Sequence, residues 1–93
     1  MDSCDLSFAE SHMRDRHGIE PAWAEEALPD PDALTIRPDP ASRSGRSVRT
    51  NGYSTSAACL LTVITVAQRA VTYGVNSWRA SATDVQRYKE DLQ

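Results

Sequence analysis

The chain has 93 residues, of which 40% are hydrophobic and 25% are charged, and this is the composition of one globular domain with a modest core spanning residues 1–93. Its formal net charge of −3 argues against a protein that binds nucleic acid tightly through charge alone. The longest apolar stretch, Ala57 to Ala67, is too short to cross a bilayer, and Asp2 and Asp5 stand where a secretory signal would be basic, so we expect a soluble cytoplasmic protein with no membrane partner.

Two helices are expected in the first third of the chain. The segment from Ser7 to Glu10 fits a capping box, which predicts a first helix that runs to about Arg16. Gly18 follows as a C-terminal stop, because glycine readily adopts the left-handed conformation that ends helices. Pro21 suits a first helical position, so a second helix is predicted over Pro21 to Leu28.

Strand signals follow. Ala33 to Arg37 can form a short edge strand between proline-containing segments. From Arg46 to Asn51 the side chains alternate with a period of two, which predicts a longer strand with a basic edge or face. Asn51-Gly52 is either a turn or a bulge within a continuing strand, and the pattern alone leaves both open.

The most apolar part of the chain predicts the centre of a sheet. Ala57 to Ala67 is almost continuously apolar, which is typical of a strand covered on both faces. After a short connection, Val71 to Trp78 predicts a further strand with Gly74 at a bulge. Because successive strands are joined by short connections, we expect an antiparallel meander of four strands with the helices on one side.

A helix is expected at the end of the chain. Ser81 or Thr83 can cap it, and Ser81 with Asp84 resembles a capping box closed by an acid. One apolar stripe is formed by Val85, Tyr88 and Leu92. The predicted fold class is therefore α+β, with a four-stranded antiparallel sheet, two N-terminal helices and one C-terminal helix.

The cysteines and histidines do not indicate a metal site. Cys4 lies in a polar leader and Cys59 in an apolar run, which favours free thiols and a reducing compartment. His12 and His17 are five residues apart, and no cysteine stands at zinc-binding spacing from them. No Walker-type phosphate loop is present in the sequence either, so we expect neither a metal nor a cofactor.

Charge is distributed unevenly. Residues 1–41 contain ten acidic and three basic residues, whereas residues 42–89 contain seven basic residues and one acidic residue, Asp84. The basic half can form one positive face that attracts a polyanion, or its arginines can scatter over a solvated sheet. The sequence leaves both possibilities open.

Several short segments follow one another in a characteristic order: Arg16-His17-Gly18-Ile19, the Glu- and Ala-rich stretch 22–28, the turn with Asp30 and Asp32, the basic strand 46–49, the apolar strand 60–66, Ser77-Trp78-Arg79-Ala80 and Arg87-Tyr88. In order and spacing, over roughly residues 8 to 90, these segments resemble the BrnT family of bacterial toxins. The resemblance implies a RelE-like fold. It also implies a ribonuclease that cleaves RNA without metal, arrests translation and is held in check by a cognate antitoxin.

Cleavage of RNA needs proton transfer and fixed positive charge. His17 lies in the family motif, and the unperturbed imidazole pKa of about 6.5 suits a general acid or base. Arg49 and Arg79 are the predicted catalytic arginines, because a guanidinium pairs with phosphate oxygens. Arg49 is expected to share the site with Arg79, with Arg46 at its rim, and Arg46 and Arg43 are predicted to bind substrate.

Two aromatic residues and an alternative function remain open. Tyr53 and Trp78 can each stack an unpaired base, or can be partly buried in the core. His17 can instead interact with the end of a helix. The acidic total motivates a second functional hypothesis, which is a catalytically inactive module that binds an antitoxin-like partner.

Overall fold

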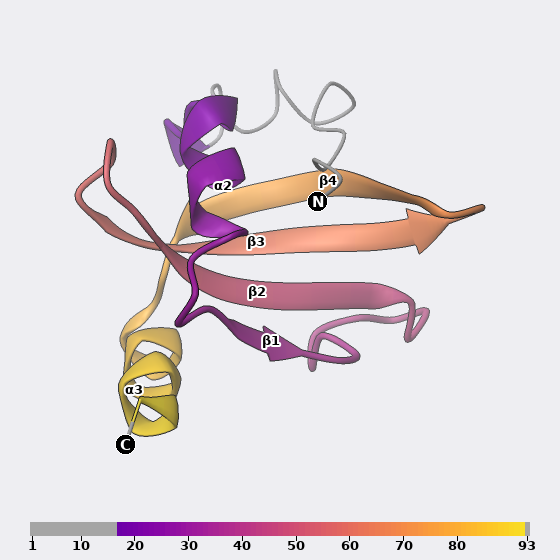
Figure 1. Ribbon diagram of the computed structural model, residues 1–93. Helices are drawn as coiled ribbons and strands as arrows, with labels where there is room; N and C mark the ends of the chain where they lie inside the picture. Colours follow the sequence, from indigo (N-terminus) through magenta and orange to yellow (C-terminus); the bar gives the residue numbers. More distant parts are fainter. Residues whose placement is uncertain (1–16, 93) are drawn as a thin grey trace.

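The structure, a computed structural model, describes residues 17–92 (Figure 1). Its elements are α2 (Pro21–Ala27), β1 (Leu34–Ile36), β2 (Ser47–Ser54), β3 (Cys59–Gln68), β4 (Val71–Arg79) and α3 (Ala82–Asp91). The strands form one antiparallel sheet in the order β1-β2-β3-β4, which confirms the predicted α+β meander. The predicted first helix, which would run to about Arg16, lies outside the described residues.

Helix α2 supplies the core on one face of the sheet. Pro21 occupies its first turn, as predicted, and Leu28 is its C-cap. Ala24 and Ala27 are fully buried against Leu61 and Val63 of β3. Full burial of an aliphatic side chain stabilises a fold by about 1.5–3 kcal/mol, so the β3 contacts are a main source of stability for this layer.

Strand β2 continues through Asn51-Gly52 to Ser54, so the turn is wrong; the second alternative is right that the strand continues but wrong about a bulge. Strand β2 pairs with β3 without interruption, from Ser47 opposite Val66 to Ser54 opposite Cys59. A Cβ atom at Gly52 would overlap the backbone of Ala27. Position 52 therefore requires glycine because α2 approaches the sheet closely there. The Asn51 side chain points to the opposite face of the sheet.

The two described helices cover opposite faces of the sheet. Asn51 and Gly52 are neighbours on a regular strand, so they point to opposite sides. The Asn51 side chain donates to Asp84 of α3, whereas Gly52 lies against α2. The expectation that the helices lie on one side is thus wrong, and Figure 1 shows α2 and α3 on different sides of the strands. Short connections fix the strand order, but they do not fix the face to which a helix returns.

The hairpin between β3 and β4 contains two local irregularities. Arg69 and Ala70 form its two-residue loop, and both have positive φ, 52° and 67°. The register shifts between Ile64 and Thr65, whose partners are Asn76 and Gly74. This shift confirms the predicted bulge at Gly74, and it changes the twist of β4 near its middle.

Helix α3 packs against the β1–β2 side of the second face. Ser81 caps it by accepting a hydrogen bond from the Asp84 backbone N–H at 3.2 Å, as predicted. Tyr88 is buried, whereas Leu92 is exposed, so the predicted apolar stripe faces the sheet only in its first part. Within residues 17–92, neither helix has the length and hydrophobicity needed to span a membrane.

Candidate functional site

Arg49 and Trp78 lie on the face of the sheet that carries α3, and the His17 ring lies beside that of Trp78; we call these three residues the Trp78 cluster. Thr62 of β3 pairs with Asn51 on one side and with Trp78 on the other. Trp78 therefore shares a face with Asn51 and with Arg49, two residues earlier on β2. The Arg49 guanidinium carbon lies 5.7 Å from the Trp78 ring centroid, within cation–π range. The His17 ring centroid lies 5.8 Å from that of Trp78, with the rings tilted by 51°.

Two carboxylates hold Arg49. Its Nε donates to Oδ1 of Asp39 at 2.8 Å, and its Nη1 donates to Oδ2 of Asp84 at 2.6 Å. The Arg49 side chain is only 13% exposed. Burial by itself lowers the pKa of Arg49, but the hydrogen bond from Asp39 and the charge of Asp84 outweigh it, so the pKa is raised. The guanidinium therefore stays cationic and is fixed in place.

Asp84 is the buried centre of this arrangement. Its Oδ1 accepts from Asn51 Nδ2 at 3.1 Å and from Arg87 Nη1 at 3.2 Å. The Ser81 and Thr62 hydroxyls lie 3.4 and 3.5 Å from its Oδ2. Burial by itself raises the pKa of Asp84, but the Asn51 hydrogen bond and the charge of Arg49 outweigh burial, so the pKa is lowered overall. The carboxylate is therefore ionised.

Sequence reasoning missed Asp84 as a partner of the site. The available signal is an acid three residues after the cap, and in the sequence this spacing indicates a capping box and nothing more. In the structure the backbone N–H of Asp84 completes the cap with Ser81, while its carboxylate faces the sheet. One residue therefore both begins the helix and docks it.

Asp39 was also missed. It is buried in the segment between β1 and β2, and its backbone N–H donates to the Ser47 carbonyl at 2.8 Å. Its Oδ1 accepts from the Ala41 N–H at 3.3 Å as well as from Arg49. An aspartate between two prolines resembles an ordinary turn residue, so nothing in the local sequence separated it from Asp30 or Asp32.

Arg79 lies on the other face, so the predicted sharing of one site by Arg49 and Arg79 is wrong. It follows Trp78 directly on β4 and pairs with Leu61, whose side chain belongs to the α2 layer. Its Nη1 lies 2.9 Å from the sulfur of Cys59, a free and half-buried thiol. The physical reason is strand alternation, because adjacent residues on β4 cannot both reach the Trp78 cluster.

Arg43 and Arg46 are exposed in the segment that leads into β2. Within residues 17–92, no hydrogen bond, ion pair or cation–π contact joins either side chain to the Trp78 cluster. Tyr53 is 43% exposed. It lies at a separate pocket of about 250 Å³ lined by Glu26, Pro29, Asp30, Pro31, Tyr53 and Thr55.

The pocket beside Tyr53 is acidic. Hydrogen bonds from the Ser56 side chain and backbone lower the pKa of Glu26 to about 2. Burial raises the pKa of Asp30, but hydrogen bonds from the Tyr53 and Asp32 backbones and from Tyr88 lower it overall. Two ionised carboxylates repel phosphate, so this pocket does not suit the RNA contact expected of Tyr53.

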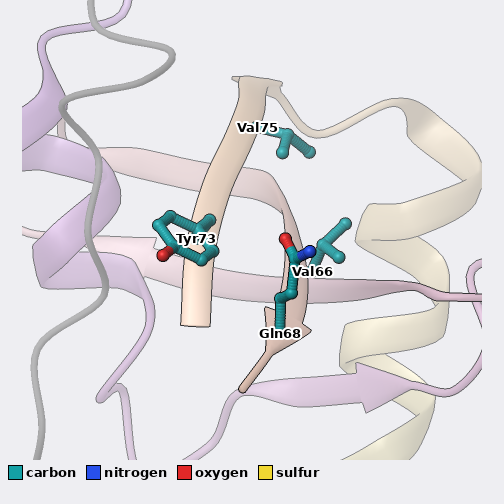
Figure 2. A pocket seen from close by; sticks show the side chains of 4 residues that line it. All are labelled: Val66, Gln68, Tyr73 and Val75. Carbon is teal, nitrogen blue, oxygen red and sulfur yellow. The ribbon is translucent and has the colours of Figure 1, made fainter. Parts of the chain in front are cut away.

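A second pocket lies on the β3–β4 hairpin (Figure 2). It has a volume of about 340 Å³ and is lined by Val66, Gln68, Tyr73 and Val75. Val66 lies on the same face of the sheet as Arg49, because Arg49 pairs with Ile64, and Ile64 lies two residues before Val66 on β3. None of the residues expected to act on RNA lines this apolar pocket.

In the part of the chain that the structure describes, no three His, Cys, Asp or Glu residues are placed to hold a metal ion. No known protein-family model matches the sequence, and no curated protein is detectably similar to it.

Proposed function

We propose that the protein is a metal-independent endoribonuclease with a RelE-like fold, which acts as the toxin of a bacterial toxin–antitoxin pair of the BrnT type. The observation that carries this proposal is the gathering of His17 and Arg49 at Trp78. A proton-transfer group and a fixed cation come from distant parts of the chain to one aromatic side chain. This pairing meets two of the chemical requirements for RNA cleavage.

The proposed reaction needs no external reactant. A base removes the proton of a ribose 2′-hydroxyl, and the 2′-oxygen attacks the adjacent phosphorus. The bond from phosphorus to the 5′-oxygen breaks, and that oxygen takes up a proton. The products are a 2′,3′-cyclic phosphate and a 5′-hydroxyl, so protons balance and nothing is oxidised or reduced.

Each residue of the Trp78 cluster has a role in this scheme. His17 performs one of the two proton transfers, because imidazole both accepts and donates protons near neutral pH. Arg49 stabilises the negative charge that develops on the phosphorane-like transition state. The Arg49 guanidinium is oriented by Asp39 and Asp84 before substrate binds. Donors prepositioned in this way commonly supply a large part of the rate enhancement of an enzyme. Trp78 contacts both groups and so brings them to one place on the molecule.

The test is cleavage of a labelled RNA by purified protein in the presence of a chelator. We expect His17→Ala and Arg49→Ala each to lower the cleavage rate by about 100-fold or more. Arg37→Ala is the matched control, because Arg37 is exposed directly after β1 and its substitution removes the same charge as Arg49→Ala. The same variants, induced in cells without a partner, should not arrest growth, whereas wild type and Arg37→Ala should. Wild-type protein that neither cleaves RNA nor arrests growth would contradict the proposal.

A second candidate is a catalytically inactive module that binds an antitoxin-like protein. One observation favours it: the Arg49 charge is balanced by two carboxylates, and Arg79 lies on the other face of the sheet. The predicted cationic groups therefore do not form one basic site. A stable complex with an antitoxin, together with intact RNA at high protein concentration, would support this candidate over the nuclease.

A further inference from the structure

Arg49 has one terminal nitrogen that its carboxylate partners do not use. The Nε group donates to Asp39, and Nη1 donates to Asp84. Among the hydrogen bonds of residues 17–92, none involves Nη2. A guanidinium carries five N–H donors in a rigid plane, so fixing two nitrogens also fixes where the third one lies.

We infer that Asp39 and Asp84 are positioning residues, which clamp Arg49 against Trp78 so that its Nη2 group donates to one oxygen of a substrate phosphate. This inference rests on the proposed function, because it takes RNA as the ligand. It also specifies the contact: Arg49 holds phosphate through one nitrogen rather than through the two-nitrogen fork that free arginines offer.

The clamp is rigid because each carboxylate is itself held. Asp39 is fixed by its backbone hydrogen bond to Ser47 and by the Ala41 N–H. Asp84 is fixed by its bond from Asn51 and by the helix cap at Ser81. The two anchors come from different elements, so loss of one leaves the guanidinium free to turn about the other.

Charge gives the clamp a second consequence. Asp39 and Asp84 carry two negative charges against the one positive charge of Arg49, and Arg87, whose side chain is 41% exposed, restores neutrality. The site therefore attracts a polyanion less than a bare arginine would. Removing the Asp39 charge should strengthen RNA binding, while removing the Asp39 contact should weaken catalysis, and these two effects can be measured separately.

The experiment compares Asp39→Asn with Asp39→Ala. Asparagine keeps the Oδ1 acceptor and removes the charge, whereas alanine removes both. Asp91→Asn is the control, because it makes the same charge change at an exposed position of α3. Binding is measured with a 2′-O-methyl oligoribonucleotide, which cannot be cleaved, and kcat and KM with the matching RNA.

We expect both Asp39 variants to bind the methylated oligonucleotide about 3- to 10-fold more tightly than wild type at low salt. We expect kcat to fall about 3-fold or less in Asp39→Asn and about 10-fold or more in Asp39→Ala. Asp91→Asn should leave both quantities close to wild type. Asp39→Ala protein that keeps the wild-type kcat, or that binds no more tightly than Asp91→Asn, would overturn the inference.

A spectroscopic readout separates failure of the clamp from failure of the nuclease proposal. In wild type, the Arg49 side-chain N–H resonance should be sharp, should shift on addition of the methylated oligonucleotide, and should broaden in Asp39→Ala. If these changes occur but wild type does not cleave RNA, the nuclease proposal fails and the positioning role stands. If the Arg49 resonance does not respond to the oligonucleotide, the positioning role fails whether or not RNA is cleaved.

Discussion

Tyr88 of α3 donates its hydroxyl to Oδ2 of Asp30 at 2.8 Å, which joins the last helix to the turn after α2 across 58 residues of sequence. The same oxygen accepts the Tyr53 backbone N–H at 2.8 Å. One carboxylate thus connects a turn, a strand and a helix. It is also a site where stability can be tested without touching the Trp78 cluster.

Tyr88→Phe should lower the free energy of unfolding by about 1–2 kcal/mol, because it removes one hydrogen bond to an ionised acceptor. Denaturant unfolding at neutral pH measures this change. Tyr73→Phe is the control, because Tyr73 is half-buried and its hydroxyl forms no hydrogen bond within residues 17–92. Equal losses in the two variants would mean that the Asp30 contact contributes nothing beyond the packing of a ring.

The Tyr88 contact also predicts a dependence on alkaline pH. Burial, together with the hydrogen bond and charge of Asp30, raises the pKa of Tyr88 from 10.0 to about 12. A raised pKa in the folded state adds stability that is fully present below pH 10 and is lost as pH rises toward 12. Wild type should therefore lose stability over this range more steeply than Tyr88→Phe. Parallel pH profiles for the two proteins would contradict the assignment.

Glu26 predicts the opposite dependence at acidic pH. Its carboxylate accepts from Ser54, Thr55 and Ser56, and its pKa falls from 4.5 to about 2. A lowered pKa in the folded state adds stability that is present above pH 4.5 and disappears as pH falls toward 2. Glu26→Gln should therefore be less stable than wild type at pH 7, and the difference should shrink between pH 4.5 and 2. Thermal unfolding at a series of pH values tests this, with exposed Glu25→Gln as the control.

Local signals predicted the elements of this fold well. The period of two, the cap at Ser81 and the glycine at the β4 bulge each depend on residues close in sequence, and the structure has all three features. The pair Asn51-Gly52 shows the limit of local signals. It has the chemistry of a turn, but the close approach of α2 decides its conformation, and that approach depends on residues in another part of the chain.

The site could be predicted only in part for the same reason. The chemistry of imidazole and guanidinium groups points to His17 and Arg49, and the structure brings both to Trp78. Their carboxylate partners Asp39 and Asp84 depend on the strand register and on the return path of α3, and no local pattern contains that information. Arg79 shows the consequence: it follows Trp78 directly on β4, so its side chain points to the face of the sheet opposite to Arg49.

Gly52→Ala should destabilise the fold by about 3 kcal/mol or more, because the added methyl group overlaps the backbone of Ala27 rather than a side chain that can move. Gly45→Ala is a useful comparison. Its added methyl group meets nothing within 4 Å, but its φ of 73° disfavours any side chain. We expect that change to cost about 1 kcal/mol. Chemical denaturation that gives equal losses for the two variants would contradict the close packing of α2.

Ala70→Gly should stabilise the protein. Ala70 has a φ of 67° in the two-residue loop between β3 and β4, and an L-residue with a side chain is strained there. Glycine adopts this conformation without steric cost, so we expect a gain of about 0.5–1 kcal/mol after its greater entropy in the unfolded chain is included. The midpoint of thermal unfolding measures the gain. Ala67→Gly, at an exposed position inside β3, should instead destabilise the protein.

Asp84→Ala should be among the most damaging single changes on the α3 face. It leaves the half-buried Arg49 with Asp39 as its one remaining carboxylate partner, and it removes the acceptor for Asn51. Loss of one member of a buried ion pair commonly costs about 3–5 kcal/mol. Denaturant unfolding should show this loss, and the Arg49→Met/Asp84→Leu/Asp39→Asn triple variant should recover part of it, because the three buried charges are then removed together. Recovery would show that the pair costs stability to maintain and is present for the orientation of Arg49; no recovery would mean that the ion pair itself stabilises the fold.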